Sequence, residues 1–318
     1  MVAFSPYASL LAEVPLREGE VSVLGSHTRY WDYGPVDAAV TVIAVHGFRG
    51  EHHGLDPIVA HLRGIRVLSP DLPGFGESTP MTGAEHSIAG YSSWLRGFVE
   101  ALHLADQPVI LGHSFGSIVT SAAVADGLQT PRLILINPIA APALSGPKAV
   151  LTWLTVQYYR VAAALPERVG YALLSNWLIV RFTSVVMVTT KDPALRRWIH
   201  SQHQTYFSRF SDRATVLAGF DASVTSDVSM AAGRIAVPTL LIAADHDPIT
   251  SVRALHRLAG LFADARLVMF EDVGHLIHYE RPLEAATEIV AFLGSGQVAT
   301  ESARPTAGGS QRPAGSTL

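Results

Sequence analysis

The chain has 318 residues, of which 48% are hydrophobic and 16% are charged, and its formal net charge is −4. This length and composition predict one globular domain with room for an insertion, and nucleic-acid binding is not expected because no long basic run occurs. Cysteine is absent, which excludes disulfides, thiolate nucleophiles and cysteine metal sites. The N-terminus lacks a basic start followed by a sustained apolar segment, so we expect a cytoplasmic protein without a signal peptide.

Short runs rich in β-branched and other apolar residues recur along the chain and predict strands. The first segment, Val21–Gly34, is typical of an antiparallel hairpin at a sheet edge. Further strands are predicted over Thr41–Val45, Arg66–Pro70, Val109–Gly112, Arg132–Asn137, Thr239–Ala244 and Arg266–Glu271. Most of these runs are apolar on both faces, and helical spacings lie between them, as in the stripe from Tyr91 to Leu102. The pattern predicts an α/β fold with a mostly parallel sheet covered by helices.

The alternation of strand and helix stops after residue 138 and resumes near residue 232. The segment between has helix-like stretches and several aromatic residues, including Trp153, Tyr159 and Trp177. We therefore predict a core of residues 1–138 and 232–293, and a helical cap insertion over 139–231. The aromatic residues either form the insertion's own core or face a substrate. Residues 294–318 contain almost no large apolar residues and are predicted to be a disordered tail.

Ser114 lies in the stretch "VILGHSFGSIV", where a predicted strand ends and a predicted helix begins. The pattern Gly-x-Ser-x-Gly is that of a nucleophile elbow, a strained turn that needs small residues two positions before and after the serine. Gly112 and Gly116 meet this requirement. A turn serine without catalytic function is the alternative, and the strand before it and the helix after it favour a nucleophile.

A serine nucleophile needs a base, and the base needs a carboxylate that orients it. His275 follows the last predicted strand in a glycine-containing loop, whereas His278 is expected on the surface of the final helix. Asp247 follows the strand Thr239–Ala244 and is the preferred carboxylate, with Asp245 as the alternative.

A tetrahedral intermediate needs hydrogen-bond donors for its oxyanion. The backbone N–H of Phe115, the residue after the nucleophile, is one expected donor. The second is expected from the loop after Thr41–Val45, where the N–H of Phe48 is the natural candidate. His46 is expected to brace this loop, and Asp71 is interpreted as structural.

Two short groups contain residues of the kind that bind metals. They are Glu51–His53 and Asp245–Asp247, and neither matches a zinc motif such as His-Glu-x-x-His. The predicted site uses no metal and no cofactor.

The motifs "HGF" at His46, "DLPGFGES" at Asp71, "GHSFGS" at Gly112, "DHDP" at Asp245 and "GHLIHYERP" at Gly274 together resemble the α/β-hydrolase superfamily. The order Ser, Asp, His along the chain is also that of the superfamily. The resemblance implies the α/β-hydrolase fold with a cap in the position of the insertion. It further implies a serine hydrolase of the carboxylesterase type, in which Ser114, Asp247 and His275 form and hydrolyse an acyl-enzyme.

Alternatives remain within and outside this reading. Epoxide hydrolases and haloalkane dehalogenases carry Asp at the nucleophile position, where this chain has Ser114. Carbon–carbon bond hydrolases of the meta-cleavage-product type have a similar layout, although they typically carry Trp after the catalytic His, where this chain has Leu276. A lyase of the same fold, or a non-catalytic protein that binds a small ligand, are further alternatives.

The expected partner is a small-molecule substrate with a hydrophobic acyl or alcohol group, because the insertion is apolar and aromatic. The apolar run that begins at Trp177 is interrupted by Arg181 and is short for a bilayer span, so stable membrane insertion is not expected. The oligomeric state is not predicted from the sequence.

Overall fold

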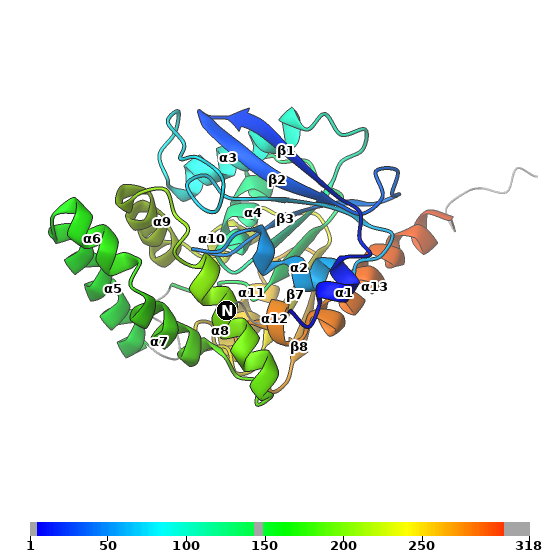
Figure 1. The fold of residues 1–318 in the computed structure, drawn as a ribbon. Coiled ribbons are helices and arrows are strands. Elements are labelled where there is room, and N and C mark those ends of the chain that lie inside the picture. Colours follow the sequence, from blue (N-terminus) through cyan, green and yellow to red (C-terminus); the bar gives the residue numbers. More distant parts are fainter. Residues whose placement is uncertain (1–4, 143–148, 302–318) are drawn as a thin grey trace, which may run out of the picture.

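The computed structural model describes residues 5–142 and 149–301, and its centre is an eight-stranded sheet (Figure 1). The strand order is β1-β2-β4-β3-β5-β6-β7-β8. The strands are β1 (Leu16–Val23), β2 (Ser26–Tyr33), β3 (Thr41–Val45), β4 (Arg66–Pro70), β5 (Val109–His113), β6 (Leu133–Ile136), β7 (Thr239–Ala244) and β8 (Ala265–Phe270).

The sheet is mostly parallel, as predicted. Strands β3 to β8 pair in parallel, whereas β1 pairs antiparallel with β2, and β2 antiparallel with β4. The predicted edge hairpin is therefore confirmed, although its first strand begins at Leu16, five residues before the predicted start at Val21. The bounds of β3, β4 and β7 are those predicted from the sequence, and the bounds of the other three predicted strands differ by one residue at one or both ends.

Alternate residues of the central strands pack into two separate apolar layers, which explains why these strands are apolar on both faces. On β3, Ile43 contributes to one layer, and Val42 and Ala44 contribute to the other. The first layer includes side chains of α3 (Ile88–Ala101), α4 (Phe115–Ala125) and α11 (Val252–Ala259). The second includes side chains of α2 (Asp56–Val59) and α13 (Pro282–Glu301). Three short helices complete this part of the chain: α1 (Ala8–Leu11), η1 (His52–Gly54) and α12 (Ile277–Glu280).

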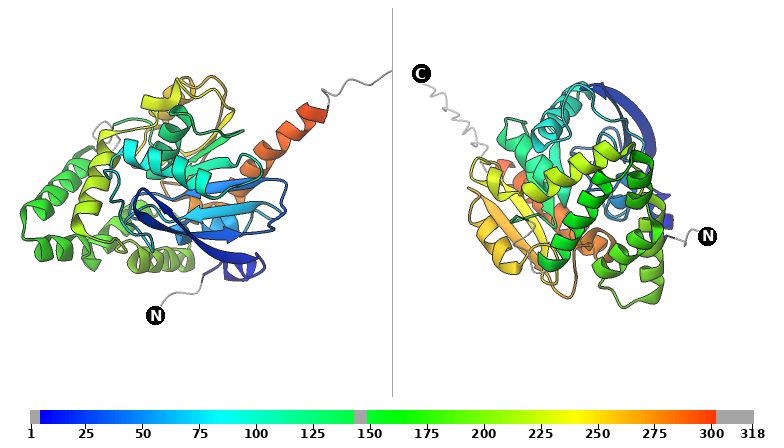
Figure 2. Two further views of the ribbon diagram at one scale, coloured as in Figure 1. Left: turned by 90° about the horizontal axis from the view of Figure 1, so that it is seen from above. Right: turned by 90° about the vertical axis from the view of Figure 1, so that its left-hand side faces the viewer.

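Six helices occupy the described part of the segment between β6 and β7. They are α5 (Ala149–Ala164), α6 (Glu167–Leu174), α7 (Trp177–Met187), α8 (Pro193–Tyr206), α9 (Arg213–Thr225) and α10 (Ser229–Ala232). Side chains cap the starts of three of them: Asn176 accepts a hydrogen bond from the N–H of Leu178, Asp192 from that of Ala194 and Asp212 from that of Thr215. Helices α5, α6, α7 and α9 lie to one side of the sheet in Figure 1 and in the left panel of Figure 2, an arrangement that is consistent with the predicted insertion.

The division of the chain into residues 1–138, 139–231 and 232–293 stays a prediction. Helix α13 continues to Glu301 and thus passes the predicted start of the tail at residue 294. Once a helical turn exists, each added residue contributes one backbone hydrogen bond. Ile289 and Leu293 anchor α13 in the second layer, and the helix continues from there beyond residue 294. The remainder of the predicted tail, residues 302–318, lies outside the described residues.

Candidate active site

The serine of the predicted elbow occupies a strained turn between β5 and α4. Ser114 has φ 53° and ψ −117°, a backbone conformation that costs free energy for any residue with a side chain. A Cβ added at Gly112 would lie 2.4 Å from the carbonyl oxygen of Gly116, and one added at Gly116 would lie 2.3 Å from the carbonyl oxygen of Val45. The glycines on either side of Ser114 are therefore required by close backbone approach.

The structure brings together Ser114, His275 and Asp247, which the sequence separates widely. The Oγ atom of Ser114 lies 2.7 Å from Nε2 of His275, and Nδ1 of His275 lies 2.7 Å from Oδ2 of Asp247. His275 and Asp247 are 3% and 5% exposed, whereas Ser114 is only partly buried. The three side chains form one hydrogen-bonded chain whose accessible end is the serine.

The contacts of Asp247 decide which nitrogen of His275 carries the proton. Oδ1 of Asp247 accepts hydrogen bonds from the backbone N–H groups of Ile249, at 2.8 Å, and Thr250, at 3.2 Å. An ionised carboxylate can only accept, so His275 carries its hydrogen on Nδ1, and Nε2 is free to accept from Ser114. In the described residues the alternative carboxylate, Asp245, forms no hydrogen bond or ion pair with His275; its Oδ2 lies 3.9 Å from Nε2 of His246.

Asn137 completes the hydrogen bonding of Asp247 and was not identified from the sequence. Its Nδ2 donates to Oδ2 of Asp247 at 3.1 Å and to the carbonyl oxygen of Gly274 at 3.3 Å. Asn137 directly follows β6 with φ 46°, a conformation that asparagine tolerates better than most residues. The sequence did contain a signal for this role. Asn137 ends a predicted parallel strand, and the next predicted strand leads to Asp247.

The loop after β3 packs against Ser114. A Cβ added at Gly47 would lie 3.2 Å from Cβ of Ser114, so the next residue, Phe48, begins directly beside the serine. In residues 5–142 and 149–301 the backbone N–H groups of Phe48 and Phe115 donate to no protein acceptor. These are the two donors that the sequence assigned to an oxyanion, and that assignment stays a prediction.

His46 holds the loop in place. Its Nε2 accepts from the backbone N–H of Leu72 at 2.8 Å, so Nδ1 carries the hydrogen and donates to the carbonyl oxygen of Gly47 at 2.8 Å. Burial lowers the pKa of His46, which favours this neutral form. Asp71 is buried nearby and accepts from the backbone N–H groups of His52 and Glu77, which fits its interpretation as structural.

The expected position of His278 on the surface of the final helix is wrong. His278 is 5% exposed, and its ring centroid lies 4.0 Å from that of His113. The chain forms the separate short helix α12 directly after His275, and this turn directs His278 into the interior. Burial lowers the pKa of both His113 and His278 well below the usual value, so both are neutral beneath the elbow.

Aromatic side chains from the helices between β6 and β7 pack onto the loop that carries Phe48. The Phe48 ring lies 6.2 Å from Tyr159 of α5 and 6.1 Å from Phe220 of α9, and these two rings stack at 3.6 Å. Phe48 also contacts Phe115 at 6.1 Å. The aromatic residues of this segment thus serve both its packing and the surroundings of Ser114.

The group Glu51, His52 and His53 places three possible metal ligands within 4.8 Å of one another. Protein contacts already engage each of them. Nδ1 of His52 lies 2.9 Å from Oδ1 of Asp71, Nδ1 of His53 lies 2.5 Å from Oε1 of Glu51, and Oε2 of Glu51 lies 3.6 Å from Nη1 of Arg209. The positive charge of Arg209 beside the Glu51 carboxylate disfavours binding of a metal cation there. That the function uses no metal stays a prediction.

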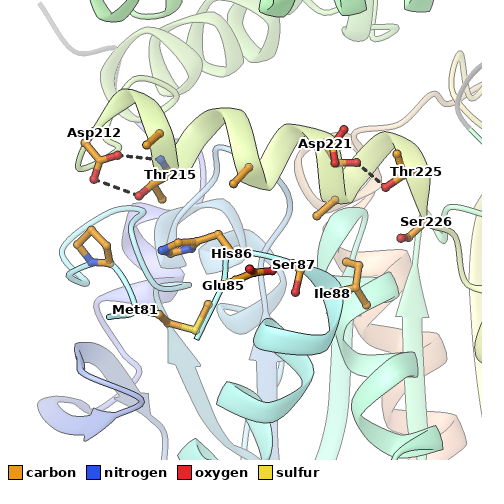
Figure 3. A pocket seen from close by; sticks show the side chains of 14 residues that line it. Met81, Glu85, His86, Ser87, Ile88, Asp212, Thr215, Asp221, Thr225 and Ser226 are labelled. Atoms are coloured by element: carbon orange, nitrogen blue, oxygen red, sulfur yellow. Dashed lines mark hydrogen bonds between the residues drawn. The ribbon is translucent and has the colours of Figure 1, made fainter. Parts of the chain in front are cut away.

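A separate hollow of about 600 Å³ lies between α9 and the segment from Pro80 to Ile88 (Figure 3). Asp212, which caps α9, and Asp221 of α9 form one wall, and Met81 and His86 lie opposite them. None of its lining residues belongs to the hydrogen-bonded chain of Ser114, so this hollow is not the candidate active site.

A family model for the α/β hydrolase fold matches residues 40–282. The matched part is more than half of the 318 residues, and the chain belongs to the α/β-hydrolase fold family. The predicted resemblance is thereby confirmed. The class of this protein is a hydrolase of the α/β fold, and Ser114 lies at the turn between its β5 and α4.

Several known proteins resemble this chain over most of its length. Lipase 1 of Psychrobacter immobilis is 25% identical over 278 residues, which cover 84% of this chain and 81% of that protein. Lipase 3 of Moraxella sp. strain TA144 is 24% identical, with coverage of 79% and 76%. A solved structure described as a membrane phospholipase A and bacterial virulence factor aligns with a TM-score of 0.70 and 20% identity, covering 92% of this chain and 89% of that one.

Proposed function

We propose that this protein is a serine hydrolase that cleaves a carboxylic ester, or a related acyl bond, through an acyl-enzyme. The observation that carries the proposal is the continuous hydrogen-bonded chain from Ser114 through His275 to Asp247, which ends at an accessible hydroxyl. The lipases among the similar proteins support ester hydrolysis as the reaction class.

The geometry supports a two-stage reaction. As the Ser114 hydroxyl attacks the acyl carbon, Nε2 of His275 takes its proton, and Asp247 stabilises the resulting imidazolium through Nδ1–H. The oxyanion accepts hydrogen bonds from the N–H groups of Phe48 and Phe115, and His275 then protonates the leaving alcohol. Water attacks the acyl-enzyme with His275 again as the base, and the acid is released with Ser114 restored.

The surroundings of Ser114 favour a substrate with a hydrophobic acyl or alcohol group. The aromatic rings of Phe48, Phe115, Tyr159 and Phe220 lie in contact beside the proposed oxyanion donors. Burying an apolar chain against such rings stabilises the complex by about 25 cal/mol per Å² of apolar surface removed from water.

A fluorophosphonate probe and a series of nitrophenyl esters test this function. Ser114→Ala is expected to abolish labelling and to lower kcat/KM by roughly 10⁴-fold or more, and Asp247→Asn by roughly 10⁴-fold. The matched control for the serine is Ser121→Ala. Ser121 lies on α4, the helix that follows Ser114, and its buried hydroxyl has no hydrogen-bond partner in the described residues. The matched control for the carboxylate is Asp245→Asn. Equal labelling of wild type and Ser114→Ala would exclude Ser114 as the nucleophile.

The same enzyme preparation separates the alternative reactions. A carbon–carbon bond hydrolase would cleave dienone-type substrates faster than esters, and a binding protein would not turn over either. Preference for short or charged acyl groups would contradict the proposed hydrophobic substrate. A cytoplasmic location stays a prediction.

A further inference from the structure

The helices α5, α6 and α7 expose an unusual amount of apolar surface. Fifteen large hydrophobic side chains are exposed in the described residues, and eight of these lie between Trp153 and Val185. They include Trp177 at 63% exposure, Phe182 at 60% and Trp153 at 53%. Exposed aromatic and aliphatic side chains gathered in this way mark an interaction surface. We call this surface, from Trp153 to Val185, the α5–α7 face.

The exposed residues share one side of each helix. At 100° per residue, Trp177, Phe182 and Val185 lie within an arc of about 140° on α7, and the buried Val180 and Ser184 fall outside this arc. On α5, Trp153, Leu154 and Val161 fall in a similar arc. The three helices lie at the end of the molecule farthest from α13, and this end of the molecule faces the viewer in the right panel of Figure 2.

The charge on the same segment is opposite to that of the whole protein. Residues 153–185 contain three Arg and one Glu, a net charge of +2, whereas the complete chain carries −4. Arg160, Arg168 and Arg181 are exposed and form no ion pair within the described part of the chain. Arg181 projects from the apolar arc of α7, between Trp177 and Phe182. This combination complements a surface that is both apolar and negatively charged.

The local fold favours lying along a bilayer over crossing it. The stretch Glu167–Met187 is long and apolar enough to span a membrane by length and composition. An 18-residue part of it has a mean hydropathy of 1.4, and 22% of that part is buried. The structure divides it into α6 and α7, with a break at Ser175 and Asn176, where Asn176 caps α7. A broken pair of helices that is anchored in the protein on one side presents only the other side to lipid.

We propose that the α5–α7 face docks the protein on the surface of an anionic lipid bilayer. Trp153, Trp177 and Phe182 enter the boundary between headgroups and acyl chains, where aromatic rings are favourable. Arg168 and Arg181 extend their aliphatic stems along this surface and place their guanidinium groups on headgroup phosphates. Docking would bring a hydrolase with apolar surroundings at Ser114 to the membrane surface, but it depends on neither Ser114 nor His275.

Vesicle sedimentation with the full chain tests the proposal. Vesicles of phosphatidylcholine alone are compared with vesicles that contain phosphatidylglycerol in a mixture of about 7:3, at low and at physiological salt. We expect binding to the anionic vesicles that weakens with salt, and much weaker binding to phosphatidylcholine. Equal binding to both, or no sedimentation with either, would overturn the proposal.

Two sets of variants locate the binding surface. Trp177→Glu with Phe182→Glu is expected to abolish sedimentation, and Arg168→Ala with Arg181→Ala to lower the partition coefficient by roughly fivefold for each charge removed. The matched controls are Met230→Glu, which alters a residue that is 67% exposed on α10, and Arg257→Ala on α11. If the controls weaken binding as strongly as the α5–α7 variants, the face is not the binding surface.

Two further measurements separate this inference from its rivals and from the proposed function. Ser114→Ala is expected to bind vesicles as the wild type does. The α5–α7 variants are expected to hydrolyse a soluble short-chain ester at the wild-type rate. The membrane proposal and the proposed function can therefore be contradicted separately. Sedimentation velocity identifies the rival occupant. A dimer that the α5–α7 variants dissociate, together with absent vesicle binding, would assign this face to a second copy of the chain.

Discussion

The guanidinium of Arg49 donates a hydrogen bond to the carbonyl oxygen of Leu174 at 2.8 Å, and thereby joins the loop after β3 to the end of α6. A second bond, 2.9 Å long, runs to the carbonyl oxygen of Phe207 at the end of α8. Carbonyl groups at helix C-termini lack helical partners and carry partial negative charge, so they accommodate a buried cation without a carboxylate. Arg49 is 7% exposed and directly follows Phe48, so helices α6 and α8 fix the loop that carries the proposed oxyanion donor.

The first prediction is that Arg49 positions the Phe48 N–H group. Arg49→Ala leaves two carbonyl groups without their partner and frees the loop, and we expect kcat for a soluble ester to fall roughly 10- to 100-fold with little change in KM. Arg49→Lys, with a single cationic centre, is expected to restore part of the rate.

Arg213→Ala is the matched control, because the Arg213 guanidinium also donates to helix-end carbonyls, those of Ala162 and Leu165, but away from Ser114. It is expected to lower the free energy of unfolding by about 1–3 kcal/mol and to leave kcat unchanged. Arg49 would be only structural if Arg49→Ala showed this same pattern.

The second prediction concerns Asn137, whose side chain donates to Asp247 and to the carbonyl oxygen of Gly274. Asn137→Ala is expected to lower kcat roughly 10- to 100-fold, because Asp247 loses one of the groups that orient it toward His275. Asn137→Asp is expected to lower kcat further, since it places a second carboxyl group beside the first. A steady-state comparison of the two variants with Asn176→Ala, a helix cap in α7, measures the effect, and equal kcat values in all three would refute it.

The sequence predicted the fold well where the pattern was local. The predicted bounds of β3, β4 and β7 were correct. Each of these largely apolar runs is followed directly by a polar residue, His46, Asp71 or Asp245, which marks its end. Ser114, Asp247 and His275 could be identified because each follows a predicted strand, and parallel strands end at the same sheet edge.

The features that the sequence did not reveal depend on contacts between distant segments. The Asn137 side chain gains its role only when β6 and β7 pair, and Arg49 only when α6 and α8 end beside it. The burial of His278 depends on the direction in which the short helix α12 leaves the loop after His275. The spacing of residues in the sequence does not indicate the direction in which a segment leaves a turn or which distant segment it packs against.

The third prediction tests the steric requirement of the elbow. Gly116→Ala places a Cβ 2.3 Å from the carbonyl oxygen of Val45, a contact that only movement of α4 or β3 relieves. We expect a loss of about 1–3 kcal/mol of unfolding free energy together with a loss of esterase activity. Gly294→Ala, where an added Cβ meets nothing within 4 Å, is the control and is expected to change neither. Wild-type stability of Gly116→Ala would show that the elbow tolerates a side chain there.

The fourth prediction is that acid destabilises the fold through its buried neutral histidines. Burial lowers the pKa of His203 to about 3, with the nearby charge of His200 as a lesser cause. Burial likewise lowers the pKa of His113 and His278. In the unfolded chain these groups titrate near 6.5. Between pH 6.5 and 3 the unfolded state therefore binds more protons, and the stability contributed by each neutral ring is complete above pH 6.5 and is lost as the pH falls.

Urea unfolding at pH 7.5, 6.5 and 5.5 measures this dependence. Below pH 6.5 each such histidine is expected to remove about 1.4 kcal/mol of unfolding free energy per pH unit, and His203→Asn is expected to reduce the slope by that amount. His246→Asn, whose side chain is 61% exposed, is the matched control. Nδ1 of the buried His203 ring lies 2.7 Å from Oγ of Ser184, and its Nε2 has no hydrogen-bond partner among the described residues. A slope that His203→Asn leaves unchanged would mean that this ring becomes charged within the fold.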